Sequence, residues 1–537
     1  MKLPALGANL PAPNLYERAL AYVAPKRARE TYLTRVAFYG SGQYAGARHD
    51  KTSMKAFTPR AGSADSDSIG DLPTLRARSR DLTRNAPIAR GARNTSRVNV
   101  IGSGLRLKST LQRELLGLSK EAATAWEDRA EQLFDLWASS KLADVTGQQN
   151  FYELQSLAFC GAFESGDAFA VRRHKPRKGS ILALALQMIE ADRCATPADK
   201  VADDIRDGVE HDADGEPVAY YFRDRHPGDA LFSPTYKAES WSRVPAKGAR
   251  TGERQVIHLF DRDRIGLSRG VPMLAPVIED LKQLDRYSEA ELMAAVVSAF
   301  FTVFIKNENA GGASDIVGEE VPGLTTGNQL ALGSGSIVEL GAGESIETAN
   351  PARPNANFDP FFQAIVRKIG VGLGIPFEVL IMHFTASYSA SRAALETAWQ
   401  FFTDRRVWLA RNFCQPVYEW FLFEAVARGL IDAPGFFDDP VKRAAWCGAE
   451  WIGPSRIVLD PKKEADAEKV WVDMGVKTVE QVTIAQTGGD FWRNQEARGE
   501  EVALRRRLKL EPAEPAAPGA RAPNTQDQDE GDSDAGT

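Results

Sequence analysis

The chain has 537 residues, of which 43% are hydrophobic and 26% are charged, as expected for a soluble globular protein with several subdomains. The four cysteines, Cys160, Cys194, Cys414 and Cys447, form no C-x-x-C pair, which argues against a disulfide scaffold or a zinc site. The most apolar run, Met293–Ile305, has 13 residues. A membrane span needs about 20, so we interpret this run as a buried helix end that leads into a strand.

Charge is distributed unevenly along the chain. The net charge is −6, yet Met1–Thr110 holds 19 basic against 7 acidic residues, a balance of +12 that leaves −18 for the remainder. A basic arm on an acidic body suits a protein that contacts polyanions at one face and lets them slide past another. A solvated N-terminal extension without a partner is the alternative.

The N-terminal arm contains two segments with helical spacing. We predict helices over Tyr16–Tyr39 and Leu72–Val98, separated by a mobile linker over Gly40–Gly70. Seven arginines lie in the second helix: Arg76, Arg78, Arg80, Arg84, Arg90, Arg93 and Arg97. They could contact DNA phosphates, an acidic neighbouring subunit, which we favour, or only solvent.

The middle third has the pattern of an α+β domain. Amphipathic helices are expected over Leu118–Lys141 and Gln148–Glu164, with Trp126, Phe134, Trp137, Phe151 and Leu154 on their inner faces. Short strands are expected at Ala168–Arg173, Ala183–Ile189, Val209–Glu210, Val218–Arg223 and Gln255–Phe260. Asp214-Gly215 predicts a hairpin turn between the third and fourth strands.

Long helices dominate the second half. The predicted elements are a helix over Met273–Ala299, a Gly- and Asn-rich β-like insertion over Gly311–Asn350, a helix over Phe358–Leu373, an aperiodic segment over Val379–Ser389, a helix over Ala390–Arg428 and a polar helical segment over Ala465–Arg506. Pro416 should kink the helix over Ala390–Arg428. The acidic chain from Glu511 onward should be disordered.

Sequence motifs of catalysis are weak. Gly266–Gly270 (GLSRG) matches the G-x-S-x-G pattern of a hydrolase nucleophile, but no strand leads directly into it. Gly370, Gly372 and Gly374 end a helix, whereas a dinucleotide-binding motif begins one, and we interpret them as sites of close helix packing. The six histidines show no metal-ligand spacing. We therefore expect no catalytic residue, no metal and no cofactor, with a hydrolase using Ser268 as the enzyme alternative.

Seven stretches, taken in order, resemble the lambda-type family of phage portal proteins. They are Leu75–Leu105, Phe151–Phe169, Leu186–Arg193, Gly208–Phe222, Val256–Leu292, Gly374–Glu396 and Trp451–Ala467. The resemblance spans about residues 15–505. In that family the R-G-V-P step leaves no catalytic role for Ser268.

The resemblance implies an α+β portal fold with a wing, a helical stem, a β-rich clip, a long kinked helix and a helical crown, assembled as a ring of twelve subunits around a DNA channel. The implied parts are a basic N-terminal arm (1–110), the wing (111–272), a first stem helix (273–305), the clip (306–356), a second stem helix (357–375), a tunnel loop (376–389), the kinked helix with a return to the wing (390–460), the crown (461–506) and a disordered acidic tail (507–537).

Two sets of channel residues follow. The tunnel loop would place His383, Phe384, Thr385, Ser387 and Tyr388 near DNA, with Tyr388 instead favoured as an anchor of the loop. The stem would place Lys282, Asp285, Arg286 and Glu289 at the lumen. Acidic residues outnumber these bases on the stem, and we expect a net acidic lumen because each neutralised phosphate would slow the moving duplex.

The implied partners are other copies of the chain, double-stranded DNA without sequence specificity, the terminase large subunit, the head–tail connector, and the major capsid and scaffold proteins, with no membrane. The implied location is the portal vertex of the capsid in the virion, and the host cytoplasm during assembly. A structural ring or adaptor that never touches DNA is the alternative from another class.

Overall fold

A computed structural model describes residues 14–40, 44, 52–54, 56–231, 240–299, 303–307, 344–348, 357–384, 387–456, 460–508 and 510. The chain divides into two compact units, Met1–Ser66 and Asp67–Thr537. The first contains α1 (Leu15–Val23) and α2 (Pro25–Gly40). One helix was predicted here; two form, because Pro25 has no N–H to continue α1 and disfavours a helical backbone at the residue before it.

Proline also divides the second predicted helix. The arginine-rich segment forms α4 (Leu72–Asn85) and α5 (Pro87–Val100), and Ala86 between them has an extended backbone with φ −94° and ψ 117°. A short helix, α3 (Ala64–Ser68), lies within the predicted linker, which is otherwise partly outside the described residues.

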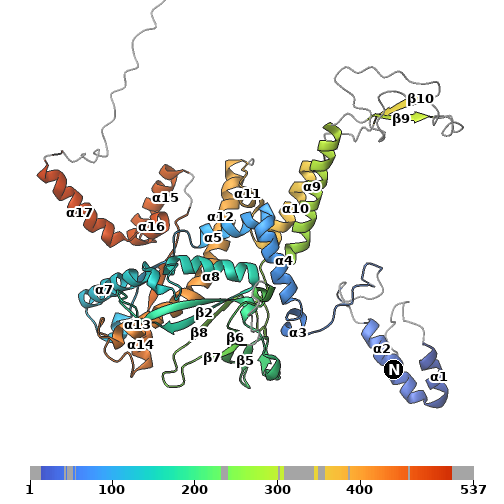
Figure 1. Ribbon diagram of the computed structural model, residues 1–537, viewed down its shortest axis with the longest axis horizontal. Helices are drawn as coiled ribbons and strands as arrows, with labels where there is room; N and C mark the ends of the chain where they lie inside the picture. The colour runs from blue at the N-terminus through green and yellow to red at the C-terminus, as the bar shows by residue number, and fades with distance from the viewer. Residues whose placement is uncertain are drawn as a thin grey trace, which may run out of the picture. The chain divides into compact units, whose positions relative to one another are not determined.

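Two antiparallel sheets form the middle of the chain, as Figure 1 shows. The first has the order β3-β2-β8, and the second has the order β4-β5-β6-β7. Their strands are β2 (Asp167–His174), β3 (Leu184–Glu190), β4 (Ile205–Arg206), β5 (Val209–His211), β6 (Pro217–Arg223), β7 (Trp241–Pro245) and β8 (Val256–Phe260). All five predicted strands are confirmed, and so is the hairpin turn, where Gly215 adopts φ +85°.

A third sheet joins distant parts of the chain. Strand β1 (Arg106–Ser109) pairs antiparallel with β11 (Ala449–Ile452), and neither strand was predicted. The helices around these sheets are α6 (Arg113–Leu116), α7 (Lys120–Ala138), α8 (Phe151–Ser165), α12 (Tyr388–Leu409), α13 (Gln415–Ala427) and α14 (Pro440–Trp446).

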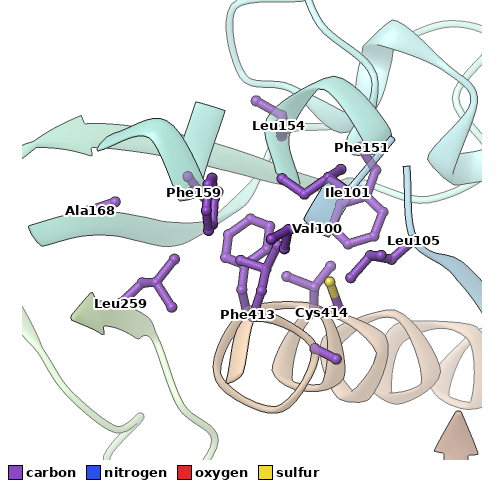
Figure 2. Close-up of a cluster of buried hydrophobic side chains, with 14 of the residues drawn as sticks. Val100, Ile101, Leu105, Phe151, Leu154, Phe159, Ala168, Leu259, Phe413 and Cys414 are labelled. Carbon is purple, nitrogen blue, oxygen red and sulfur yellow. The ribbon is translucent and has the colours of Figure 1, made fainter. Parts of the chain in front are cut away.

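The main hydrophobic core lies between these helices and the β3-β2-β8 sheet. Figure 2 shows Phe413 and Cys414 facing Val100, Ile101 and Phe159. Phe134 packs edge-on against Phe151, Tyr418, Phe421 and Trp451, with ring centroids 5.1–5.8 Å apart. The predicted inner faces are confirmed for Phe134, Trp137, Phe151 and Leu154, which are buried, and Trp126 is half-buried.

The long predicted helix around Pro416 is irregular where expected. Between α12 and α13, residues Ala410–Cys414 are π-helical. Pro416 lacks the N–H that an α-helix needs, and its ring crowds the preceding turn, so a wider turn accommodates it.

Candidate functional site

The two predicted stem helices are present and lie side by side (Figure 1). The first is α9 (Ile278–Ala299), preceded by a 3-10 turn over Ala275–Val277, so it begins later than the predicted Met273. The second is α10 (Phe358–Leu373), with the predicted bounds. Of the predicted clip, the structure describes the end of β9 (Val303–Asn307) and β10 (Glu344–Thr348), which pair antiparallel; the rest lies outside the described residues.

Small residues let the stem helices pack closely. A Cβ on Gly372 would lie 2.5 Å from Val277 Cγ1, and one on Gly370 would lie 2.6 Å from the Ile375 carbonyl oxygen. Gly374 ends α10 with φ +70°. The close packing predicted for these glycines is confirmed at Gly372 against Val277, whereas Gly370 makes room for the Ile375 carbonyl and Gly374 ends the helix.

Polar and aromatic contacts also join the two helices. Lys368 Nζ on α10 donates to Asp280 Oδ1 on α9 at 2.7 Å. The Tyr287 ring stacks on Phe358 at 5.5 Å and meets Phe361 edge-on at 5.0 Å. The Asp280 charge is therefore directed at the partner helix.

The four predicted lumen residues all lie on α9. Lys282, Arg286 and Glu289 are exposed, and Asp285 is half-buried. Burial raises the pKa of Asp285, an effect that Lys282 partly opposes. These side chains are available to a channel, and their position at the lumen stays a prediction.

The last turns of α9 carry apolar side chains on their surface. Leu292 is 67% exposed, Met293 60% and Val296 45%. We predicted a buried helix end over Met293–Ile305, and for Met293 and Val296 that prediction is wrong in the single chain, because both side chains are exposed.

The predicted tunnel loop contains α11 (Phe377–Leu380) and an unusual turn. Met382 has a left-handed backbone with φ +55°, and the His383 amide donates to the Glu378 carbonyl oxygen at 3.1 Å. The side chains of His383 and Phe384 are exposed.

The end of this segment leads into α12. Ser387 is exposed and its hydroxyl accepts from the Ala390 amide as the N-cap of α12, and Tyr388 is the first residue of that helix. Thr385 lies outside the described residues.

A buried charge cluster lies directly before the first stem helix. Asp167, at the start of β2, accepts four hydrogen bonds. Its Oδ2 receives Arg76 Nη2 at 2.7 Å and Arg269 Nε at 2.8 Å, and its Oδ1 receives the Gly270 amide at 2.7 Å and His258 Nε2 at 2.8 Å. The side chains of Asp167 and Arg269 are 0% exposed.

Arg269 extends this cluster towards the second sheet. Its Nη1 donates to the carbonyl oxygens of Cys194 at 2.9 Å and Asp207 at 2.6 Å, and its Nη2 donates to the Ala191 carbonyl oxygen at 2.9 Å. One guanidinium therefore ties the segment before α9 to β2, to the turn that follows β3 and to the turn between β4 and β5. Ser268, 4% exposed, lies in an irregular segment without the strand and helix of a nucleophile elbow.

The charge cluster shifts the pKa of its members. Burial alone would raise the pKa of Asp167, but Arg269, His258 and Arg76 lower it well below its ordinary value. Burial also lowers the pKa of His258, more than Asp167 raises it, so this imidazole is neutral and donates its Nε2–H. It lies between the rings of Phe169 and Phe260, at 4.3 and 4.2 Å.

Three of the seven arginines of the basic segment form ion pairs with carboxylates of the same chain. Arg76 pairs with Asp167, Arg80 with Asp192, and Arg93 with Glu164. Our interpretation of these three as contacts to DNA or a neighbouring subunit is wrong, since their charges hold α4 and α5 to the α+β body.

The described part of the chain contains no group of three or more His, Cys, Asp or Glu side chains arranged to hold a metal ion. Asp212 instead closes the β5–β6 hairpin, accepting from the amides of Asp214 and Glu216. None of the described helices combines the length and apolar character needed to cross a membrane.

The chain matches a known protein family. The family described as "Phage portal protein, lambda family" matches residues 50–406, which is more than half of the chain. The chain belongs to this family. The α+β architecture, with its helical stem pair, is therefore a portal fold.

Individual portal proteins are similar over nearly the whole chain. Portal protein B of Escherichia phage lambda is 24% identical over 496 residues, covering 88% of this chain and 91% of that protein. The portal protein of Escherichia phage N15 is 26% identical over 530 residues, covering 93% and 97%.

Solved structures of gene transfer agent particles are also similar. A chain of the virion of the native particle aligns over 88% of this chain and 99% of its own length, with 14% identity and a TM-score of 0.41. A chain of the neck of the empty particle aligns over 77% and 92%, with 15% identity and a TM-score of 0.42.

Sequence reasoning missed the Asp167 cluster. Its side chains come from three of the portal-like stretches, but nothing local shows that Asp167 and Arg269 pair. The available signal was a single charged residue inside an apolar or glycine-rich run, as in SGDAFAV around Asp167 and SRGVP around Arg269.

Proposed function

We propose that twelve copies of this portal-family chain form a ring at one vertex of a phage capsid, and that double-stranded DNA passes through its central channel during packaging and ejection. Family membership supports this role. The ring would lie in the virion, after assembly in the host cytoplasm with the major capsid and scaffold proteins.

The observation that carries the proposal is apolar surface on the elements assigned to the stem and crown. Leu292 and Met293 on α9 are more than half exposed. The crown would consist of α15 (Pro461–Asp473), α16 (Val479–Thr487) and α17 (Phe491–Arg507), and none of their residues is buried. Their exposed side chains include two tryptophans, Trp471 at 44% and Trp492 at 56%. Large exposed apolar patches mark association sites, and neighbouring copies in a ring would cover them.

The channel itself would be lined without strong DNA binding. In this proposal Lys282, Arg286, Asp285 and Glu289 on α9 face the lumen, and His383, Phe384, Thr385 and Ser387 of the tunnel loop lie nearest the duplex. Acidic groups beside the basic ones lower the affinity of this surface for phosphates, so the duplex is not held in place. The clip would bind the terminase large subunit and then the head–tail connector. No catalytic residue or cofactor is part of this role.

The mass and shape of the purified protein test the proposal. Twelve copies of 58.8 kDa give about 700 kDa by light scattering, and negative-stain images should show a ring with a central hole. A compact dimer without a channel would contradict the assembly.

Two further measurements sharpen this test. Replacing Leu292 and Met293 together by Ser should reduce ring formation, whereas Leu136→Ser, which alters a 59% exposed residue of α7, should not. Rings that fail to bind the terminase large subunit would favour the adaptor role instead.

A further inference from the structure

A pocket lies beside the segment assigned to the tunnel loop. It has a volume of about 290 Å³ and is lined by residues of α5, of α11 and the segment that follows it, and of α12, together with Arg456 and with Glu464 of α15. None of the roles proposed above uses it.

The interior of this pocket is apolar and aromatic. Ala398 and Phe402, each 2% exposed, belong to the main core and line it together with Trp399. Val98, 50% exposed, and Phe384, 47% exposed, line it as well. The interior therefore offers ring faces and methyl groups to an occupant.

The charges around the pocket cancel. Arg392, Glu396, Arg456 and Glu464 line it, two of each sign, and Arg456 pairs with Glu396. An ionic occupant would gain no net attraction from this arrangement, and its charge would lose hydration on entry. The electrostatics therefore favour an uncharged molecule.

One pocket residue has a strained backbone. Met382 adopts φ +55°, in the left-handed region that side chains other than glycine, Asn and Asp rarely occupy. Such residues persist where their surroundings hold them, often at ligand-binding and switching segments. A molecule in the pocket would contact Met382 and Phe384 together and add to these restraints.

We propose that this pocket binds a neutral aromatic molecule of one or two fused rings, and that the bound molecule holds Met382 and Phe384 against α12. An apolar cavity of about 150 Å³ accepts benzene, so a pocket of about 290 Å³ has room for a second ring. The binding stands on the geometry alone; its consequence, a restrained tunnel loop in the DNA channel, rests on the proposed function.

Indole is a suitable probe for the purified full-length protein. Saturation-transfer NMR should show saturable indole binding. Val98→Trp places a bulky group at the half-exposed edge of the pocket and should weaken binding by at least about tenfold. Val371→Trp, at an 85% exposed position of α10, is the matched control and should leave binding unchanged.

A second variant and a second measurement complete the test. Phe384→Ala removes one aromatic wall from an exposed position and should also weaken binding. Hydrogen exchange at residues 379–384 should slow when indole is bound. Absence of saturable binding, or equal binding by the Val98 and Val371 variants, would overturn the site, and binding without slowed exchange would overturn the restraint. The binding test needs neither DNA nor an assembled ring. Its outcome therefore does not depend on whether the protein proves to be a DNA channel.

Discussion

Asp167 Oδ2 accepts a hydrogen bond from Arg269 Nε at 2.8 Å, and neither side chain is exposed to solvent. Arg269 lies in the turn that leads into α9, and Asp167 begins the central strand of the β3-β2-β8 sheet. Any displacement of the first stem helix relative to the wing must therefore move or break a buried ion pair.

Removing the Asp167 charge should destabilise the fold strongly. Asp167→Asn keeps the shape of the side chain but leaves the buried Arg76 and Arg269 with only the partly exposed Asp207 as a counter-charge. Breaking a buried ion pair costs about 3–5 kcal/mol. Chemical denaturation measures the difference in the free energy of unfolding. Asp192→Asn, at a partly exposed pair with Arg80, should cost about 1 kcal/mol or less. Equal losses in the two variants would show that burial of the Asp167 pair is unimportant.

Stability should fall as the pH is lowered, and His258 should contribute first. Burial lowers the pKa of His258 in the folded state, while an unfolded histidine titrates near 6.5. The unfolded state therefore binds the proton more tightly, and stability is lost as the pH falls through about 6.5, by at most about 1.4 kcal/mol per pH unit. The pKa of Asp167 is held below its ordinary value despite burial, mainly by Arg269, so its contribution is lost in the same direction below about pH 4.

Variants at two histidines separate this effect from general acid sensitivity. His258→Gln can keep an N–H donor to Asp167 but does not titrate, so the pH dependence of unfolding between about pH 7.5 and 5.5 should become shallower. His174→Gln, at an exposed residue of β2, should leave it unchanged. An unaltered slope in the His258 variant would contradict the assignment.

The aromatic centre of the main core should tolerate no truncation. Phe134 is 1% exposed and contacts five other rings, so Phe134→Ala should lower the free energy of unfolding by about 3–5 kcal/mol. Leu136→Ala, two residues away on the same helix and 59% exposed, should change it by about 0.5 kcal/mol or less.

Whether Gly372→Ala destabilises or stabilises the fold should depend on the side chain at residue 277. Gly372→Ala places a methyl group 2.5 Å from Val277 Cγ1, and overpacking of this kind costs about 1–3 kcal/mol. In a Val277→Ala background that clash is gone, and alanine should instead stabilise the helix by about 1 kcal/mol through its higher helix propensity. A double-mutant cycle measures the reversal; additive effects would argue against the contact.

The proposed lumen can be tested by one charge reversal. Lys282→Glu should abolish DNA packaging without loss of ring formation, because it removes one of the two basic groups that we place beside the moving phosphates. Lys200→Glu makes the same change at an exposed residue of the wing and should package normally. Wild-type packaging by the Lys282 variant would contradict the assignment of this face to the lumen.

Local patterns predicted much of this fold. Apolar periodicity located α7, α8 and α10, and the Gly374-Ile375-Pro376 stop signal marked the end of the second stem helix correctly. Helix boundaries were predicted less accurately where a proline lies inside a helical pattern. Pro25 and Pro87 each divide one predicted helix into two, although the helical spacing continues across them.

Features that depend on distant partners were not predictable. The sequence of β1 is short and mostly polar, and only its pairing with β11, more than three hundred residues later in the chain, makes it a strand. The exposure of Leu292 and Met293 is a related case, since an apolar helix face indicates burial but does not say whether the covering surface belongs to the same copy. The roles of the proposed lumen and tunnel-loop residues depend on neighbouring copies in the same way.

Because β1 pairs with β11, the wing can complete its fold only late in translation. Phe134 and Trp137 emerge early, but the rings of Tyr418 and Phe421 that cover them are made more than 280 residues later. At about 5–20 residues per second, the nascent wing waits roughly 15–60 s with this aromatic surface uncovered. A chaperone that binds aromatic segments should therefore engage this chain during translation and leave once residue 452 has emerged.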